Sequence, residues 1–424
     1  MVKHALLFAA LGFSACTTTD DTEEQTSSVE SDLAVQLPNN FPILNKNGIN
    51  TTFSSNGNVD LDSSFFKQFG TNGRSCGSCH AATEGWTISA DEVKLRFALT
   101  LGRDPLFRPV DGTNSPDADV STFAARRSAY SMLLNRGTIR VGIPMPANAE
   151  FELVTVDDPY GHASAAELSM FRRPLPATNL TLMATVMWDG RVTGATIPDA
   201  LSAQADGATL GHAQALAPLP PEVNAEVVDF ESSLFNAQLT GFRTGRLDKD
   251  GANGGAEFLM GQDFVANRFD LFDGWQNSPV AARQAIYRGQ ELFNTRRRTT
   301  GGGACQGCHT AQNVGTSQRG AFFDVGVAAG ERRTADMPLY TFRNTSTGEV
   351  LQVTDPGRAL ITGVWKDMKK FKVPSLRGLS SRAPYFHDGS AKTLLDLVKF
   401  YETSLSFSFT PDEEQDLVAF LSAL

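Results

Sequence analysis

Two short segments of the chain share the pattern Cys-x-x-Cys-His. They are Cys76–His80 and Cys305–His309. This pattern is the attachment site of a c-type haem, in which both thiols bond to the porphyrin's vinyl groups and the histidine ligates the iron. Zinc is the alternative for two thiols and a histidine, but zinc ligands are usually spread over more of the chain. The sequence therefore predicts two covalent haem c groups, held by Cys76, Cys79, His80, Cys305, Cys308 and His309.

The fifth cysteine, Cys16, follows an apolar run from Ala5 to Phe13. Such a start is typical of a secretory signal peptide and is too short to span a membrane. Phe13-Ser-Ala-Cys16 resembles a bacterial lipobox, so residues 1–16 are predicted to be a signal peptide with a lipid anchor on Cys16. An ordinary signal peptide is the alternative. Bacterial haem attachment to this motif takes place outside the cytoplasm, so we expect a periplasmic or cell-envelope protein anchored in the outer membrane.

The rest of the chain is long enough for two domains. Residues 17–37 are rich in Thr, Ser, Asp and Glu, which predicts a disordered tether. The turn-forming stretch 248–255 is a plausible connection between an N-terminal domain, 38–246, and a C-terminal domain, 247–424. The net charge of −10 argues against a nucleic-acid partner.

Several helices can be read from apolar periodicity and capping residues. Pro221–Leu239 and Pro279–Asn294 each carry an apolar stripe. Thr393 and Thr410 are each followed three residues later by an acidic residue, which indicates a capping box at the start of a helix. Long alternating strand patterns are absent. We therefore expect a mainly α fold with long loops.

Three further segments carry a family resemblance. They are Met187–Arg191, Phe371–Gly378 and Ala383–Gly389. Together with the haem motifs they resemble the bacterial di-haem cytochrome c peroxidase family, which includes the MauG-type enzymes. The resemblance implies two cytochrome c-like domains related by pseudo-twofold symmetry, each with one covalent haem c. It also implies that the N-terminal haem is the reaction site and the C-terminal haem the electron relay.

The resemblance assigns roles around the relay haem. Trp188 matches the family's tryptophan between the two haems, whose implied role is electron transfer; a buried core tryptophan is the alternative. Tyr401 stands fourteen residues after His387, where peroxidases have an axial Met and MauG-type members an axial Tyr; a core tyrosine on an apolar helix face is the alternative. A phenolate ligand lowers the potential of the iron relative to a thioether. For His387 itself we expect a structural or proton-path role.

The distal face of the reaction haem departs from the family pattern. Gln204 matches the family's distal Gln, but Gln214 stands where a Glu is usual. An amide cannot shuttle a proton as a carboxylate does. His212, two residues away, could supply this acid/base function, since an imidazole exchanges protons near neutral pH. Iron ligation and a plain surface position stay open for His212.

No histidine occurs between His80 and His162, so the family's closing ligand is missing. The iron is then open, or closed by a methionine such as Met132 or Met145. His162 is interpreted as a loop residue.

One loop of the sequence has side chains that could bind Ca²⁺. The stretch Asp111–Asp119 is dense in oxygen ligands but fits no EF-hand register, so a solvated turn is the preferred interpretation over a Ca²⁺ site. The family's calcium lies between the domains, and the Asn that helps to bind it appears here as Ser128.

The leading functional hypothesis is a di-haem oxidoreductase that reduces hydrogen peroxide. Its electrons would come from a small redox protein or from a side chain of an oxidisable protein. A di-haem lipoprotein dedicated to electron transfer and a haem-dependent oxygenase are the alternatives. A homodimer is one arrangement that the sequence allows.

Overall fold

The structure is a computed structural model that describes residues 36–424. The predicted signal peptide, the lipid anchor on Cys16 and nearly all of the predicted tether lie outside these residues. Gln36 and Leu37, at the end of the tether range, pair with Asp60 and Val59 in a two-stranded sheet.

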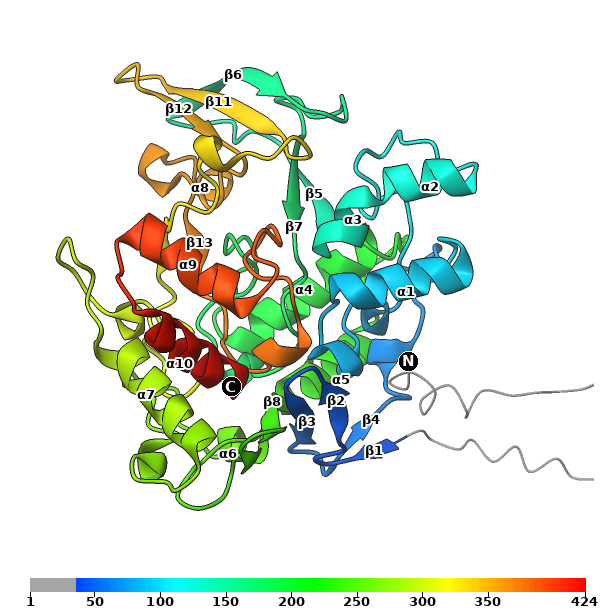
Figure 1. The fold of residues 1–424 in the computed structure, drawn as a ribbon. Coiled ribbons are helices and arrows are strands. Elements are labelled where there is room, and N and C mark those ends of the chain that lie inside the picture. Colours follow the sequence, from blue (N-terminus) through cyan, green and yellow to red (C-terminus); the bar gives the residue numbers. More distant parts are fainter. Residues whose placement is uncertain (1–35) are drawn as a thin grey trace, which may run out of the picture.

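Helices occur along the whole described chain, and those before and after residue 247 lie largely on opposite sides of the molecule (Figure 1). The first set is α1 (Ala90–Thr100), α2 (Phe123–Ala129), α3 (Ser131–Arg136), α4 (Ile197–Gly211) and α5 (Pro221–Ser233). The second set is α6 (Glu257–Met260), α7 (Ala281–Thr295), α8 (Ala359–Thr362), α9 (Leu394–Leu405) and α10 (Pro411–Ser422).

Most of the helices expected from the sequence are confirmed. The apolar stripe of Pro279–Asn294 becomes α7, and both predicted capping boxes are present at the starts of α9 and α10. The helix predicted for Pro221–Leu239 is only half right. It ends at Ser233, and the chain continues as a strand whose first six residues are all buried.

A mainly α fold is not confirmed, because strands are numerous in residues 36–424. They are short, namely β1 (Gln36–Pro38), β2 (Ile43–Asn45), β3 (Gly48–Ser54), β4 (Asn58–Asp60), β5 (Ile139–Ile143), β6 (Phe151–Asp157), β7 (Leu168–Arg172), β8 (Leu234–Gly241), β9 (Gly245–Arg246), β10 (Phe322–Phe323), β11 (Leu339–Asn344), β12 (Val350–Val353) and β13 (Phe371–Lys372). The sequence hides them because strands such as β7 are buried on both faces, so polar and apolar residues do not alternate.

The sheets join parts of the chain that are far apart in sequence. The largest has the order β2-β3-β8-β9, and a second has the order β12-β11-β6. Strand β6 precedes residue 247 and β11 follows it, and the two pair antiparallel. The remaining sheets are the pairs β1-β4, β5-β7 and β10-β13. The predicted N-terminal and C-terminal parts therefore share backbone hydrogen bonds.

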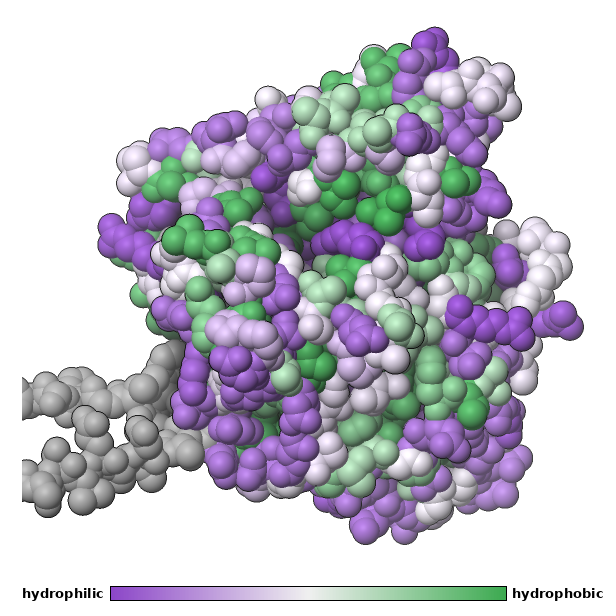
Figure 2. Space-filling view, turned by 180° about the vertical axis from the view of Figure 1, so that it is seen from behind, coloured by the Kyte–Doolittle hydropathy of each residue, from purple (hydrophilic) through white to green (hydrophobic). Residues whose placement is uncertain are grey.

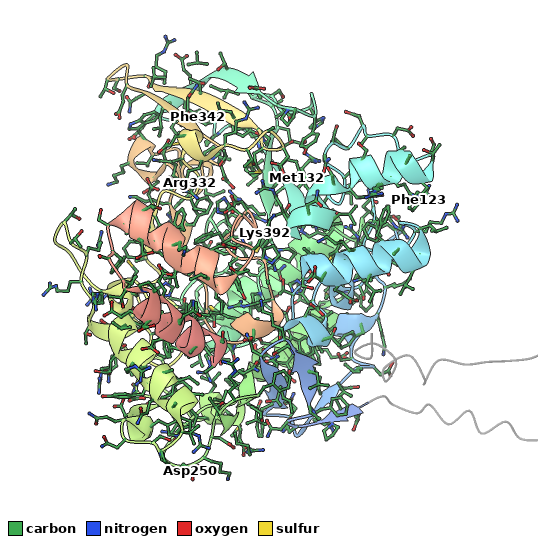
Figure 3. The ribbon with its side chains drawn as sticks, viewed as in Figure 1. Phe123, Met132, Asp250, Arg332, Phe342 and Lys392 are labelled. Carbon is green, nitrogen blue, oxygen red and sulfur yellow. The ribbon has the colours of Figure 1, made fainter. Side chains whose placement is uncertain are left out.

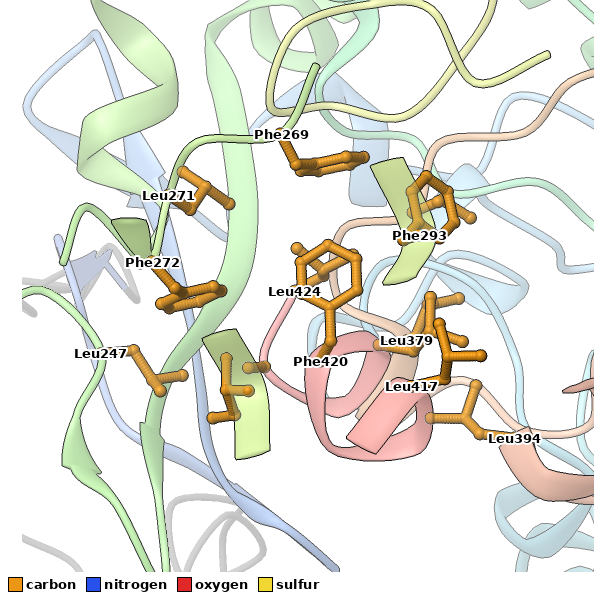
Figure 4. Packing of buried hydrophobic residues seen from close by; sticks show 14 of the residues in the cluster. Leu247, Phe269, Leu271, Phe272, Phe293, Leu379, Leu394, Leu417, Phe420 and Leu424 are labelled. Carbon is orange, nitrogen blue, oxygen red and sulfur yellow. The ribbon is translucent and has the colours of Figure 1, made fainter. Parts of the chain in front are cut away.

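The largest apolar cluster surrounds α7, α9 and α10 (Figure 4). Phe420 of α10 lies against Phe269 and Phe293, with ring centroids 5.3 and 5.5 Å apart. The close approach of α7 and α10 requires Gly289 of α7, because a Cβ there would lie 2.0 Å from the carbonyl oxygen of Asp416 in α10. This cluster packs against Cys305 and so supports the second haem motif.

Among residues 36–424, no helix combines the length and the apolar character needed to cross a bilayer. On the face shown in Figure 2, hydrophilic and hydrophobic residues are interspersed.

Candidate haem sites

Two large cavities lie inside the described structure, and each contains one Cys-x-x-Cys-His motif. The first has a volume of about 1540 Å³, including the part open to solvent, and is lined by Cys76, Cys79 and His80. The second has a volume of about 1530 Å³ and is lined by Cys305, Cys308 and His309. We call them the N-terminal and the C-terminal cavity. Their nearly equal volumes suit one large flat group in each.

Both motif histidines are held in the orientation that iron ligation requires. Nδ1 of His80 donates to the carbonyl oxygen of Trp86 at 3.0 Å, and Nδ1 of His309 donates to that of Gly315. In each ring the free nitrogen is therefore Nε2, an arrangement typical of metal-ligating histidines. Burial lowers the pKa of both, that of His309 to about 4, so both rings are neutral at pH 7.

The cysteines suit covalent attachment better than zinc binding. Burial raises the pKa of Cys76 and of Cys305 to about 12. In the part of the chain that the structure describes, no group of three or more His, Cys, Asp or Glu side chains could hold a metal ion. These donor sets fit two haems.

Trp188 lines both cavities. Its Nε1 donates to the carbonyl of Arg173 at 2.8 Å, and its own carbonyl accepts from the backbone N–H of Lys372 at 2.8 Å. The next residue, Asp189, is fully buried and forms an ion pair with Arg172. The tryptophan predicted to connect the haems is thus fixed in the wall between the two cavities.

One face of α4, with His212 directly after its last residue, forms a wall of the N-terminal cavity and brings two of the predicted distal residues to it. Gln204 and His212 are eight residues apart and line the cavity together with Ala208 between them. Gln214, also predicted to be catalytic, does not line it. Since α4 ends at Gly211, the chain turns away, and Gln214 is exposed, accepting a hydrogen bond from Asn72.

His212 is anchored by Asp111, a partner that the sequence did not reveal. Its Nδ1 donates to Oδ2 of Asp111 at 2.5 Å, and Oδ1 of Asp111 accepts from Arg74 at 2.6 Å. Burial alone would raise the pKa of Asp111, but the hydrogen bond from His212 and the charge of Arg74 outweigh burial and lower it. Asp111 is therefore ionised at pH 7, and the exchangeable nitrogen left to His212 is Nε2.

The predicted loop Asp111–Asp119 is a solvated turn only in its second half, so that expectation is wrong for residues 111–115, which are buried. The side chain of Thr113 donates to the carbonyl of Pro109, and that of Asn114 donates to Ser128 and Ser131. Asp111 itself is committed to Arg74 and His212. The buried half of the loop thus positions His212 rather than offering free oxygens to Ca²⁺.

Neither methionine suggested as a closing ligand reaches the N-terminal cavity. Met132 lies on α3 in a separate apolar cluster (Figure 3), and Met145 packs against another cluster. Met183 and Met187 line the cavity instead. His162 lies in a loop near Asp117 and Glu167 and lines neither cavity, in agreement with the sequence.

The C-terminal cavity brings Tyr401 and His309 together. Tyr401 belongs to α9, and its ring lies against those of Phe386 and Phe400. His387 also lines this cavity, where its ring stacks on Phe371 with centroids 4.0 Å apart. Axial ligation by Tyr401 stays a prediction, and its place in the cavity of the second haem motif is compatible with it.

Glu231 of α5 is a buried carboxyl group in the N-terminal cavity that sequence reasoning missed. One of its oxygens, Oε2, has no hydrogen-bond partner among the described residues. Burial raises its pKa to about 8, so it carries a proton at pH 7.

We expect Glu231→Gln to stabilise the protein increasingly as pH rises. The folded state keeps this proton up to about pH 8, whereas in the unfolded state the carboxyl loses it near its ordinary pKa of 4.5. Wild-type stability therefore falls between these values, by on the order of a few kcal/mol, and the amide avoids that loss. Thermal unfolding at pH 5 and pH 8 measures the effect. Glu226→Gln, on the exposed side of the same helix, is the control and should give no such gain.

The two cavities, each with an attachment motif and an oriented histidine, define the protein as a c-type cytochrome with two haems. No family model matches the chain. The cytochrome-c peroxidase IdrP1 of Denitromonas iodatirespirans is 31% identical over 173 residues, 36% of this chain and 44% of that protein. IdrP2, a cytochrome-c peroxidase of the same organism, is 28% identical over 294 residues, covering 62% and 70%. The methylamine utilization protein MauG of Methylophilus methylotrophus is 26% identical over 281 residues, covering 61% and 70%.

The chain spans less than half the length of some of these relatives, 44% of IdrP1 and 38% of a cytochrome c551 peroxidase of Nitrosomonas europaea. Among solved structures, a MauG-like protein associated with microbial copper homeostasis is 16% identical, with coverage of 93% and 94% and a TM-score of 0.38. In its sequence matches and its motif segments, the chain is therefore similar to the bacterial di-haem cytochrome c peroxidases and to MauG.

Proposed function

We propose that the protein reduces hydrogen peroxide in the N-terminal cavity, with electrons that arrive through the C-terminal cavity. The observation that carries this proposal is His212, which is held by the buried carboxylate of Asp111 in the cavity that also contains His80. A haem held by Cys76, Cys79 and His80 would supply the binding site for peroxide and the electrons for breaking its O–O bond.

In this proposal His212 handles the protons. Its Nε2 accepts a proton from one peroxide oxygen and delivers it to the other, which leaves as water. Asp111 keeps the imidazole ring oriented, and its negative charge balances the positive charge of His212 while the ring carries the extra proton. Asn72 and Arg74 donate to the carbonyl oxygen of His212 at 2.8 and 3.1 Å, which fixes its backbone. Gln204 contributes an amide to the same cavity wall.

Trp188 carries electrons between the cavities in this proposal, because it is the aromatic side chain that lines both. The electron source is a small redox protein or an oxidisable side chain of another protein. Location in the periplasm or cell envelope belongs to the same proposal, with a lipid anchor on Cys16, and its support is the pair of haem attachment motifs.

Electron transfer without peroxide chemistry is the second candidate. It is favoured by the position of Gln214, which lies outside the cavity and leaves the family's second distal position unfilled.

One experiment separates the two candidates. Low-temperature electron paramagnetic resonance of the ferric holoprotein should show one high-spin and one low-spin iron. Addition of peroxide with a reductant should consume one peroxide for every two electrons. Two low-spin irons, with no peroxide consumed, would contradict the peroxidase proposal and favour electron transfer.

A further inference from the structure

Three cations lie buried in the wall between the two cavities. Arg173 and Lys372 line both cavities, and Arg382 lines the C-terminal one. No more than 7% of any of the three residues is exposed. They come from separate parts of the chain, since Arg173 follows β7, Lys372 belongs to β13 and Arg382 follows a short helical turn at residues 379–381.

None of these three cations forms an ion pair with a carboxylate among residues 36–424. The neighbouring Arg172 shows how two carboxylates can neutralise a buried cation in this protein. It lies between the buried carboxylates of Asp189 and Asp355, at 2.5 and 2.7 Å. A buried charge normally has a partner of opposite sign. Arg377 also lacks one among these residues, but it lines neither cavity, whereas these three cations all lie in a cavity wall.

Their donor atoms are only partly used. Nη2 of Arg173 donates to the carbonyls of Ile88 and Arg382, at 2.7 and 2.9 Å, and its Nη1 donates to the carbonyl of Arg136 at 3.2 Å. Arg382 donates to the carbonyl of Ser375, while its Nε has no partner in the described structure.

Lys372 is the least satisfied of the three. The one partner that its Nζ has among the described residues is the sulfur of Met183, at 3.8 Å. An ammonium group has three donors, and a thioether is a weak acceptor. Burial lowers the pKa of Lys372 to about 8, which reflects the cost of this charge without a counter-ion. Oxygen acceptors are therefore missing at this position.

We infer that Arg173, Lys372 and Arg382 form a carboxylate-binding site shared by the two cavities, and that its ligands are the propionate groups of the two haems. Propionates are the anionic groups of a haem, and Arg and Lys are the side chains that pair with carboxylates. The site lies in the walls of cavities whose cysteines anchor the haems covalently. This inference needs only the two haems and holds whether or not the protein reduces peroxide.

A shared cationic wall has a measurable electrostatic consequence. Positive charge near a haem stabilises the reduced iron, which carries one positive charge fewer, and so raises its midpoint potential. Because Lys372 lines both cavities, removing its charge should lower both potentials. Arg382 lines only the C-terminal cavity, so its removal should lower mainly the potential of that haem.

The test is redox titration and thermal unfolding of the holoprotein carrying Lys372→Met. Methionine keeps the apolar length of the side chain but removes the charge. We expect both midpoint potentials and the unfolding temperature to fall, and Lys372→Arg to restore them. Arg382→Gln should lower mainly the C-terminal potential, which provides a second variant if Lys372→Met does not accumulate.

The control is Arg126→Gln. Arg126 is buried and donates to backbone carbonyls, as Arg173 does, but it lines neither cavity. Its replacement should leave both potentials unchanged. If Lys372→Met keeps both potentials and unfolds at the same or a higher temperature, the ammonium has no bound carboxylate and the inference is wrong.

The ligand could also be a free anion from solution. Titration of the wild-type holoprotein with inorganic phosphate distinguishes the sources. Carboxylates tethered to the haems should leave the potentials insensitive to phosphate. A saturable shift would identify an exchangeable anion and overturn the assignment to propionates.

Discussion

Replacing His212 with alanine is expected to slow peroxide reduction by roughly 10²–10⁴-fold, the range typical of a lost general acid/base. Both haems should remain attached, because His212 belongs to neither attachment motif. The imidazole is half-exposed at the end of α4, so its loss leaves no large cavity in a packed core. Stopped-flow mixing of the ferric holoprotein with peroxide measures the rate of the step directly.

The matched control for this variant is His162→Ala. His162 also lies near carboxylates, Asp117 and Glu167, but it lines neither haem cavity. Its loss should leave the peroxide rate within about twofold of wild type. An unchanged rate in His212→Ala would remove His212 from the mechanism and leave Gln204 as the remaining predicted distal residue on α4.

Asp111→Asn examines how His212 is positioned. The amide can keep a hydrogen bond to His212 but loses the charge that balances a protonated ring. We expect a slower peroxide rate together with a shifted pH profile, which a purely structural defect would not produce. Because Arg74 would also lose its carboxylate partner, the thermal stability of this variant must be measured in parallel.

Local signals in the sequence were sufficient for part of this site. The haem motifs, the caps of α9 and α10 and the positions of Gln204 and His212 on one helix all depend on spacings of a few residues. The ten-residue spacing from Gln204 wrongly predicted that Gln214 lies in the same cavity. A match by spacing does not show that α4 ends at Gly211, and beyond this end the chain turns away from the cavity before it reaches Gln214.

Contacts between residues far apart in the sequence could not be predicted from such short spacings. Asp111 lies 101 residues from His212, and its neighbours in sequence favoured a solvated turn. Strand β6 pairs with β11 although the predicted domain boundary lies between them, so no local pattern predicted that sheet. Lys372 belongs to the motif segment Phe371–Gly378. Only the fold shows that it lines both cavities and that no carboxylate pairs with it among the described residues.

Tyr401→Met should raise the midpoint potential of the C-terminal haem by on the order of 0.2 V, a fraction of the roughly 0.8 V that axial ligands span. An anionic phenolate stabilises oxidised iron, whereas a thioether favours the reduced form. The N-terminal potential should stay nearly constant, because Tyr401 lines only the C-terminal cavity. Spectroelectrochemical titration of the holoprotein resolves the two potentials.

Tyr401→Phe shows whether the hydroxyl is the ligand at all. Without an oxygen at this position, the C-terminal iron should lose its sixth ligand, and its electron paramagnetic resonance signal should change from low to high spin. Tyr385→Phe is the matched control. Tyr385 lines the same cavity, but its hydroxyl donates to the carbonyl of Leu379 at 2.9 Å, so its removal should leave the spectrum unchanged. A wild-type spectrum in Tyr401→Phe would show that another group ligates this iron. A low potential of the C-terminal haem could then not be caused by a phenolate ligand.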